Sequence, residues 1–160
     1  VEGWGCGNRV YAETNETTLV IDAYHVEVEK VGPEEACPGD TVTYTITVKN
    51  VGWAPICCLH IVDWVTDDRG NHMAVLLDEM IWCLGPCESV NFTVSFTIPL
   101  DWNWCDNGEY LNNHVMVYGI GCYSMDVFWD CPFVMDYDCW SVHIPVECCP
   151  YEGGNDCEVC

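Results

Sequence analysis

Apolar and polar residues alternate with a period of two between residues 41 and 49. The apolar positions are Val42, Tyr44, Ile46 and Val48, and the positions between them hold Thr41, Thr43, Thr45, Thr47 and Lys49. Successive side chains of a strand point to opposite faces, so the pattern predicts a β-strand with one face in a core and the other in water. Turn residues flank it, because Pro38-Gly39-Asp40 precedes it and Asn50-Val51-Gly52 follows.

The same period recurs in residues 89–98. There the predicted inward row is Val90, Phe92, Val94, Phe96 and Ile98. Further strands are predicted within residues 17–30, 56–64, 114–120, 123–129 and 140–146. Residues 73–82 fit either a strand or a short helix, because so short an apolar run does not distinguish the two. Seven or more short strands, separated by turns and without a clear helix, predict an all-β chain folded as a β-sandwich.

Several short motifs accompany the strand of residues 38–52. They are Val28-Glu29-Lys30, Ile61-Val62-Asp63, Leu84-Gly85-Pro86 with Glu88-Ser89-Val90, and Asn113-His114-Val115. Together these segments resemble the conserved repeat domain of prokaryotic surface proteins called domain of unknown function eleven. The resemblance covers residues 24–146 and implies an immunoglobulin-like sandwich in a cell-surface setting, with no shared catalytic site.

The chain departs from that family at Cys87, where a glycine is usual, and in its high cysteine content. It also has flanking segments that the family domain lacks. We therefore expect three parts: an N-terminal extension over residues 1–23, the sandwich over 24–146, and a cysteine-rich tail over 147–160.

Composition limits the class of protein. Half of the 160 residues are hydrophobic, which argues against a disordered chain and allows one domain with a core and short extensions. No apolar run approaches the roughly 20 residues of a membrane helix, so we expect no membrane insertion. The net charge of -22, with 26 acidic and 4 basic residues, excludes non-specific nucleic-acid binding, which requires a cationic surface.

The chain contains 14 cysteines, an even number that fits seven disulfide bridges of unassigned connectivity. They are Cys6, Cys37, Cys57, Cys58, Cys83, Cys87, Cys105, Cys122, Cys131, Cys139, Cys148, Cys149, Cys157 and Cys160. Such density indicates an oxidising compartment or a hyperthermophile. The spacing of the last four would also suit a zinc site, but disulfides are favoured in an exported chain. Sequons at Asn15 and Asn91 agree with export, and the predicted alternation places Asn91 on a wet face where it could carry a glycan.

One loop gathers hard oxygen ligands. Asp101, Asn103, Asp106 and Glu109 lie within nine residues of one another, a set that calcium could bind without the EF-hand spacing. Trp102 and Trp104 lie in the same loop, where they could stack on sugars or instead pack in a core or a subunit contact. No nucleophile, metalloprotease or phosphate-loop motif occurs in the sequence, and carboxylates dispersed over a small sandwich are usually surface groups, so we expect no enzyme.

The N-terminal extension contains a short β-prone segment, Thr18, Leu19, Val20, Ile21 and Asp22. A strand of this kind can complete the sheet of a neighbour, and the resulting head-to-tail contact builds a filament. Archaeal extracellular threads and pili built from immunoglobulin-like subunits resemble this design. The segment could instead be the first strand of its own domain. The sequence thus predicts a structural subunit of an extracellular, cell-surface filament or sheath, whose partners are copies of itself. The alternative is a secreted adhesin or carbohydrate-binding module with glycan contacts.

Overall fold

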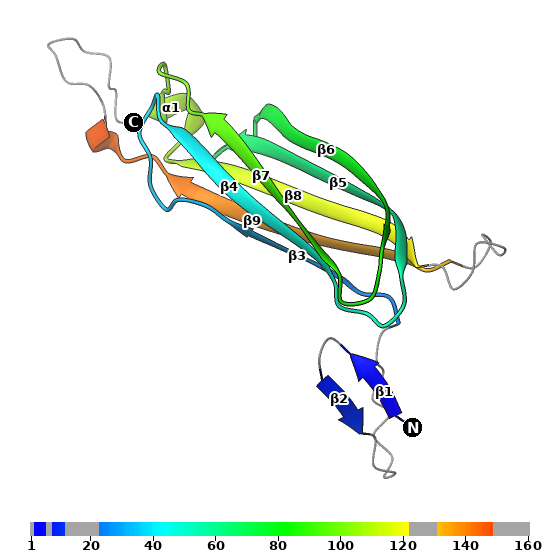
Figure 1. Cartoon of the computed structure of the whole chain (residues 1–160). Helices are drawn as coiled ribbons and strands as arrows, with labels where there is room; N and C mark the ends of the chain where they lie inside the picture. Colours follow the sequence, from blue (N-terminus) through cyan, green and yellow to red (C-terminus); the bar gives the residue numbers. More distant parts are fainter. Residues whose placement is uncertain (1, 6–7, 12–22, 122–130, 149–160) are drawn as a thin grey trace, which may run out of the picture.

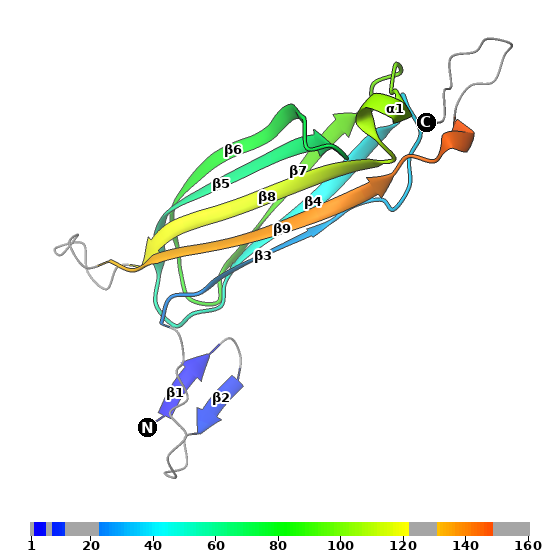
Figure 2. The ribbon, with the colours of Figure 1, turned by 180° about the vertical axis from the view of Figure 1, so that it is seen from behind.

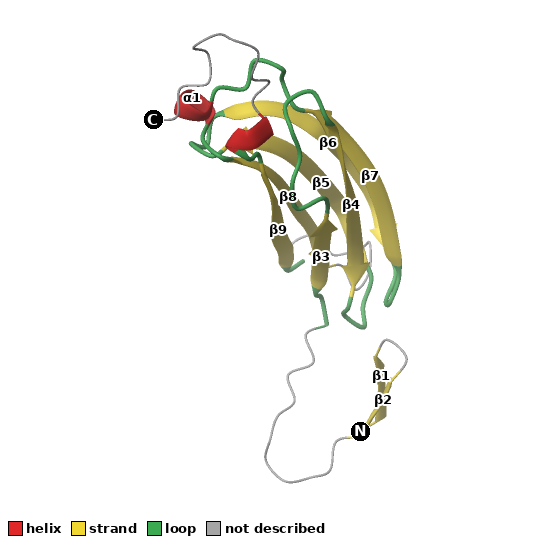
Figure 3. Ribbon diagram, turned by 90° about the vertical axis from the view of Figure 1, so that its left-hand side faces the viewer, coloured by secondary structure: helices red, strands yellow, loops and turns green. Residues whose placement is uncertain are grey.

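The computed structural model of the chain describes residues 2–5, 8–11, 23–121 and 131–148. Two antiparallel sheets face each other in these residues and enclose one apolar core (Figures 1 and 3). This confirms the predicted immunoglobulin-like β-sandwich. No helix among the described residues is long and apolar enough to cross a membrane.

The smaller sheet has the strand order β3-β4-β7. Its strands are β3 (Val26–Val31), β4 (Thr41–Asn50) and β7 (Ser89–Thr97). The larger sheet has the order β6-β5-β8-β9, which Figure 2 shows from its outer side. Its strands are β5 (Ile56–Asp67), β6 (His72–Leu84), β8 (Tyr110–Gly121) and β9 (Phe133–His143). Two short helical turns complete the sandwich, α1 (Trp104–Asn107) and η2 (Val146–Cys148).

The period-two patterns correspond to strands with one buried face. In β4, Tyr44, Ile46 and Val48 are fully buried while the threonines between them face outward. The β4–β7 register places Tyr44 opposite Val94, and outward hydroxyls pair across the strands, as Thr43 does with Ser95 at 2.9 Å. Burial of these alternate apolar rows is the main stabilising contribution to such a sandwich.

The structure decides one open alternative and corrects one strand boundary. Residues 73–82, for which strand and helix were both open, form part of strand β6. The last strand begins at Phe133 rather than at residue 140, and it pairs with β8. The segment 123–129, predicted to pair with β8, lies outside the described residues. The start of β9 does not alternate between apolar and polar residues, because this strand carries apolar and aromatic side chains on its outer face as well.

The N-terminal extension contains a hairpin where the sequence predicted irregular structure. Strands β1 (Glu2–Gly5) and β2 (Asn8–Tyr11) pair with each other in antiparallel register. The candidate donor strand, residues 18–22, lies outside the described residues, as do Asn15 and most of the C-terminal tail.

Candidate functional site

One side of the sandwich is closed by side chains of β9. Asp136 Oδ2 accepts a hydrogen bond from Val28 N, and Asp138 Oδ2 accepts one from Lys30 N, both at 2.7 Å. Beyond the end of β3 the chain continues this contact, because His143 N donates to Glu34 O at 2.8 Å and Ala36 N donates to His143 O at 3.1 Å. Backbone groups at a free sheet edge invite pairing with another chain. In this sandwich the Asp136 and Asp138 carboxylates accept hydrogen bonds from the backbone amides at the free edge of β3, so β3 is a protected edge.

The opposite side is open. Among the described strands, β7 pairs with β4 alone and β6 pairs with β5 alone, so each is the last described strand of its sheet. The inward side chains Val90, Phe92 and Phe96 of β7 are only partly buried, in contrast to the fully buried row of β4. The apolar interior therefore reaches the surface along this side. We call β7 and β6, with the inward side chains between them, the open side.

The two edges of the open side differ in charge. Strand β6 carries Asp78 and Glu79, and Glu79 lies opposite the buried Ile61, so a carboxylate occupies the core-facing row of that edge. An inward charge of this kind discourages strand addition. Strand β7 has no charged residue between Ser89 and Thr97. Of the two described edge strands on the open side, β7 is therefore the one without a charged residue.

The outer face of the larger sheet carries aromatic side chains. The Trp64 and His114 rings stack with centroids 5.2 Å apart, and the Tyr118 and Phe133 rings stack at 6.2 Å. Phe133 is 62% exposed, and Tyr137, which is hydrogen-bonded to His114 Nδ1 at 2.6 Å, is 49% exposed. The outer face of an antiparallel sheet is usually polar. This aromatic face is consequently a second candidate contact surface.

A charged network lies in the core between the sheets. Lys30 of β3 forms an ion pair with Asp63 of β5, and both side chains are 0% exposed. Asn113 of β8 donates from Nδ2 to Asp63 Oδ1 at 2.7 Å and to the Trp64 carbonyl oxygen at 3.0 Å. The Lys30 Nζ lies 5.5 Å from the centroid of the buried Tyr44 ring.

Burial controls the ionisation of this network. Burial lowers the pKa of the Lys30 amine, and its attraction to Asp63 only partly opposes the effect. Burial likewise raises the pKa of the Asp63 carboxyl against the hydrogen bonds from Lys30 and Asn113. An apolar environment disfavours the charged form of either group. The pair is thus displaced toward a neutral amine and a neutral acid.

The sequence contains a signal for this network that lies outside the motifs named above. Lys30, Asp63 and Asn113 each interrupt an otherwise apolar inward row of their strand. A buried polar side chain normally needs a partner. Three such interruptions in separate strands therefore indicate groups that meet in the core, although alternation alone does not tell which strands are neighbours.

The tryptophans of the acidic loop pack in the core, which is one of the two alternatives that the sequence left open for them. Trp102 is buried at 5% exposure, and its Nε1 donates to Gly108 O at 3.1 Å. Trp104 packs against the core and donates from Nε1 to Ile144 O at 2.8 Å. Both indoles brace α1 against the sandwich.

The predicted calcium ligands do not converge. Asn103 caps α1 by accepting a hydrogen bond from Cys105 N at 2.9 Å, and its Nδ2 donates to Asp106 Oδ2 at 3.0 Å. Within the described part of the chain, no group of three or more His, Cys, Asp or Glu side chains could hold a metal ion. Asp101, Asp106 and Glu109 are thus not gathered into such a group, and calcium binding by this loop stays a prediction.

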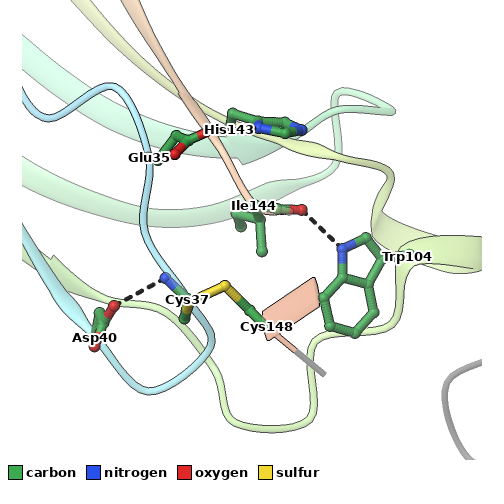
Figure 4. The surroundings of a disulfide bond; sticks show 7 residues. All are labelled: Glu35, Cys37, Asp40, Trp104, His143, Ile144 and Cys148. Atoms are coloured by element: carbon green, nitrogen blue, oxygen red, sulfur yellow. Dashed lines mark hydrogen bonds and ion pairs between the residues drawn. A yellow bond between two sulfur atoms is a disulfide. The ribbon is translucent and has the colours of Figure 1, made fainter. Parts of the chain in front are cut away.

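One disulfide anchors the start of the C-terminal tail. It joins Cys37, which precedes β4, to Cys148 in η2 (Figure 4). Asp40 Oδ2 accepts from Cys37 N at 2.9 Å, which holds the turn around Gly39 in place for the bridge. Gly39 has a φ of 92°, a conformation that favours glycine. Cys87, Cys105 and Cys131 are also disulfide-bonded.

Full pairing of the cysteines is not seen in the described residues. Cys57, Cys58, Cys83 and Cys139 are free thiols. Cys57 and Cys83 lie directly opposite each other on β5 and β6, with Sγ atoms 3.1 Å apart, so they are placed to form a cross-strand bridge on oxidation. Asn91 of the second sequon is exposed on the outer face of β7, where its Oδ1 accepts from Thr47 Oγ1 at 2.9 Å.

No protein-family model and no curated protein matches this chain. Several solved structures are similar to it, and two of them have TM-scores of at least 0.50. A CARDB domain from Pyrococcus furiosus, solved in complex with di-metal ions, has a TM-score of 0.50 at 14% identity and covers 84% of this chain and 100% of that chain. The putative ApaA protein from Bordetella pertussis has a TM-score of 0.53 at 13% identity, covering 78% and 98% respectively. Likeness at such identity establishes the β-sandwich fold alone.

Proposed function

We propose that this chain is a structural subunit of an extracellular filament or sheath, assembled when a strand from a neighbouring copy adds to the β7 edge. The observation that carries the proposal is the difference between the two sides of the sandwich. Carboxylates of β9 occupy the β3 edge, whereas β7 has no second partner strand among the described residues, no charge and an incompletely buried apolar row. Addition of one strand beside β7 would cover that row and pair the free backbone groups.

The candidate donor is residues 18–22 of another copy. Leu19 and Ile21 share one parity, so a strand in this segment can turn both toward the apolar row of β7 while Thr18 and Asp22 face water. The contact joins different surfaces of the two subunits and does not close on itself, which gives a linear polymer. Disulfides such as Cys37–Cys148 suit an oxidising, extracellular setting. No catalytic role is proposed.

The proposal is tested by removing the donor while the sandwich stays intact. The double variant Leu19→Asp with Ile21→Asp places charges in the row that would face β7, and we expect monomers by sedimentation and no filaments by electron microscopy. The matched control, Thr18→Ser with Asp22→Asn, changes only the opposite parity and should assemble as the unaltered chain does.

The acceptor side has its own variant. Phe92→Glu introduces on β7 the type of inward charge that β6 already carries in Glu79, and it should abolish assembly while circular dichroism still reports a folded sandwich. Filaments that persist in the donor variant, or after deletion of residues 1–22, would exclude strand exchange from this segment.

A second candidate function is a secreted adhesin or carbohydrate-binding module. The aromatic face of the larger sheet favours it, because exposed rings such as Phe133 and Tyr137 can stack on sugar rings. Binding on a glycan array that is lost in Tyr137→Ala and kept in Trp102→Phe would support this role. An array without binding by the folded chain would count against it.

A further inference from the structure

Three reactive polar groups meet in the sealed core of the sandwich. Lys30 comes from the smaller sheet, and Asp63 and Asn113 come from adjacent strands of the larger sheet. All three residues are at most 2% exposed. A buried ion pair costs much of what its attraction contributes, so an apolar core is a poor place for charges that serve stability alone. We therefore looked for a chemical role that accounts for these charged groups in the core.

The environment of Lys30 suits a nucleophilic amine. Its Nζ lies beside Asp63 Oδ2 and 5.5 Å from the centroid of the Tyr44 ring, within a cluster of buried apolar side chains. Desolvation favours the neutral amine, which is the form that attacks a carbonyl carbon. The backbone of Lys30 is itself held by Asp138, which accepts from its N–H at 2.7 Å. Burial thus shifts the amine toward its neutral form, and its contact with Asp63 Oδ2 holds it in the core.

Asp63 bridges the amine and the carboxamide. One carboxylate oxygen, Oδ2, contacts Lys30 Nζ, and the other, Oδ1, accepts from Asn113 Nδ2 at 2.7 Å. The Asn113 Nδ2 also donates to the Trp64 carbonyl oxygen, which orients the amide. Asn113 Oδ1 is buried without a hydrogen-bond partner among the described residues. A single carboxyl is thus in contact with a nucleophile and with the nitrogen that would leave.

We propose that Lys30 and Asn113 become joined by an intramolecular isopeptide bond whose formation Asp63 catalyses. The neutral Lys30 Nζ attacks Asn113 Cγ, and the neutral Asp63 acid gives its proton to Nδ2 through Oδ1. The Cγ–Nδ2 bond breaks and one molecule of ammonia leaves, while Asp63 takes the surplus proton of the attacking nitrogen through Oδ2 and so ends protonated, as it began. The step is an exchange of one amide for another, so it requires no oxidant, reductant or further reactant.

The bond would connect the two sheets at their centre. It joins β3, the first strand of the sandwich, to β8, the last but one, and so closes most of the domain into a covalent loop. Unlike a disulfide, it resists reduction. The inference does not depend on strand exchange, since it rests on the core of one subunit.

The test is the mass of the full, folded chain after complete reduction and alkylation of its cysteines. We expect a mass below the value calculated from the sequence by one molecule of ammonia, and a peptide map in which the segment holding Lys30 is linked to the segment holding Asn113. A folded chain with the full calculated mass overturns the proposal. A loss of one water with a link to Asp63 overturns it too, because Asp63 would then be the acyl partner.

Variants separate the roles. Lys30→Arg and Asn113→Ala should each restore the calculated mass, and Asp63→Ala should do so although it keeps both bonding partners. The matched control is Lys49→Arg, which alters the other lysine of the chain and should leave the ammonia loss unchanged. If a core variant fails to fold, the mass of the unaltered chain still decides the question. Ammonia loss that persists in Lys30→Arg would refute the assignment.

Discussion

At the scale of single residues, Asp67 shows how one buried acid can organise two loops. Its Oδ1 accepts from Asn71 N at 2.8 Å and Arg69 N at 3.0 Å, and its Oδ2 accepts from Asn71 Nδ2 at 2.8 Å and Asn107 Nδ2 at 3.2 Å. Burial by itself would raise the pKa of Asp67, but these hydrogen bonds together outweigh it and lower the pKa. The charged form is therefore favoured in the fold.

This geometry predicts a pH-dependent effect of Asp67→Asn. A lowered folded pKa contributes stability above the unfolded value near 3.8, and that contribution is lost as the pH falls through the folded pKa. We expect the variant to lose about 1–3 kcal/mol of unfolding free energy at neutral pH, and the deficit to shrink in acid. Urea unfolding at pH 7 and pH 3 measures this, with the exposed Asp101→Asn as control. A deficit that is equal at both values would contradict the role of the charge.

At the scale of elements, β3 and β9 show how side chains of one strand can take the place of a missing partner strand. Asp136 and Asp138 are two residues apart, and so are the amides of Val28 and Lys30 that they accept from. The matching spacing arises because alternate residues of a strand share a face and alternate amides share an edge. The sheets are thereby joined along one side without a continuous ladder.

Hydrogen exchange provides a reciprocal test of this closure. Asp136→Ala should speed exchange at the Val28 amide and spare Lys30, and Asp138→Ala should do the reverse. Each variant should also lose about 1–3 kcal/mol of unfolding free energy, since a part-buried amide is left without its acceptor. NMR-detected exchange of the two amides is the measurement, and each variant is the control for the other. Uniform acceleration at both sites in both variants would indicate general loosening instead.

At the scale of the whole molecule, the Cys37–Cys148 bridge ties the two ends of the sandwich together. The cysteines are 111 residues apart in sequence, so the bridge restricts almost the entire domain in its unfolded state. Longer closed loops remove more chain entropy from the unfolded state in the usual model of disulfide stabilisation. The bridge also holds η2 close to Trp104 of α1, whose Nε1 donates a hydrogen bond to Ile144 O (Figure 4).

Replacement of both cysteines by serine should therefore lower the unfolding free energy by about 4 kcal/mol. The measurement is equilibrium denaturation under oxidising conditions, compared with Cys58→Ser, which alters a free thiol and should change stability by less than about 1 kcal/mol. A double variant as stable as that control would show that the bridge contributes little to the fold.

The sequence by itself determined the strands and the class of fold. The alternation in residues 41–49 and 89–98 is local, and it survives folding because a strand must place its apolar row in the core wherever that core forms. Lys30, Asp63 and Asn113 also interrupt inward apolar rows, but no prediction was drawn from these interruptions. Two strands were harder to predict from alternation. Residues 73–82 lie in an edge strand, and the start of β9 turns apolar side chains outward, so neither segment alternates clearly between apolar and polar residues.

The tertiary structure alone decided which of these rows face one another. Sheet order places Lys30 against Asp63 and Asn113, turns Trp102 and Trp104 inward rather than toward a ligand, and sets the carboxylates of β9 against β3 while β7 stays uncovered. These outcomes depend on pairing between residues far apart in the chain. A period of two fixes the face of each side chain, but it contains no information about the neighbouring strand.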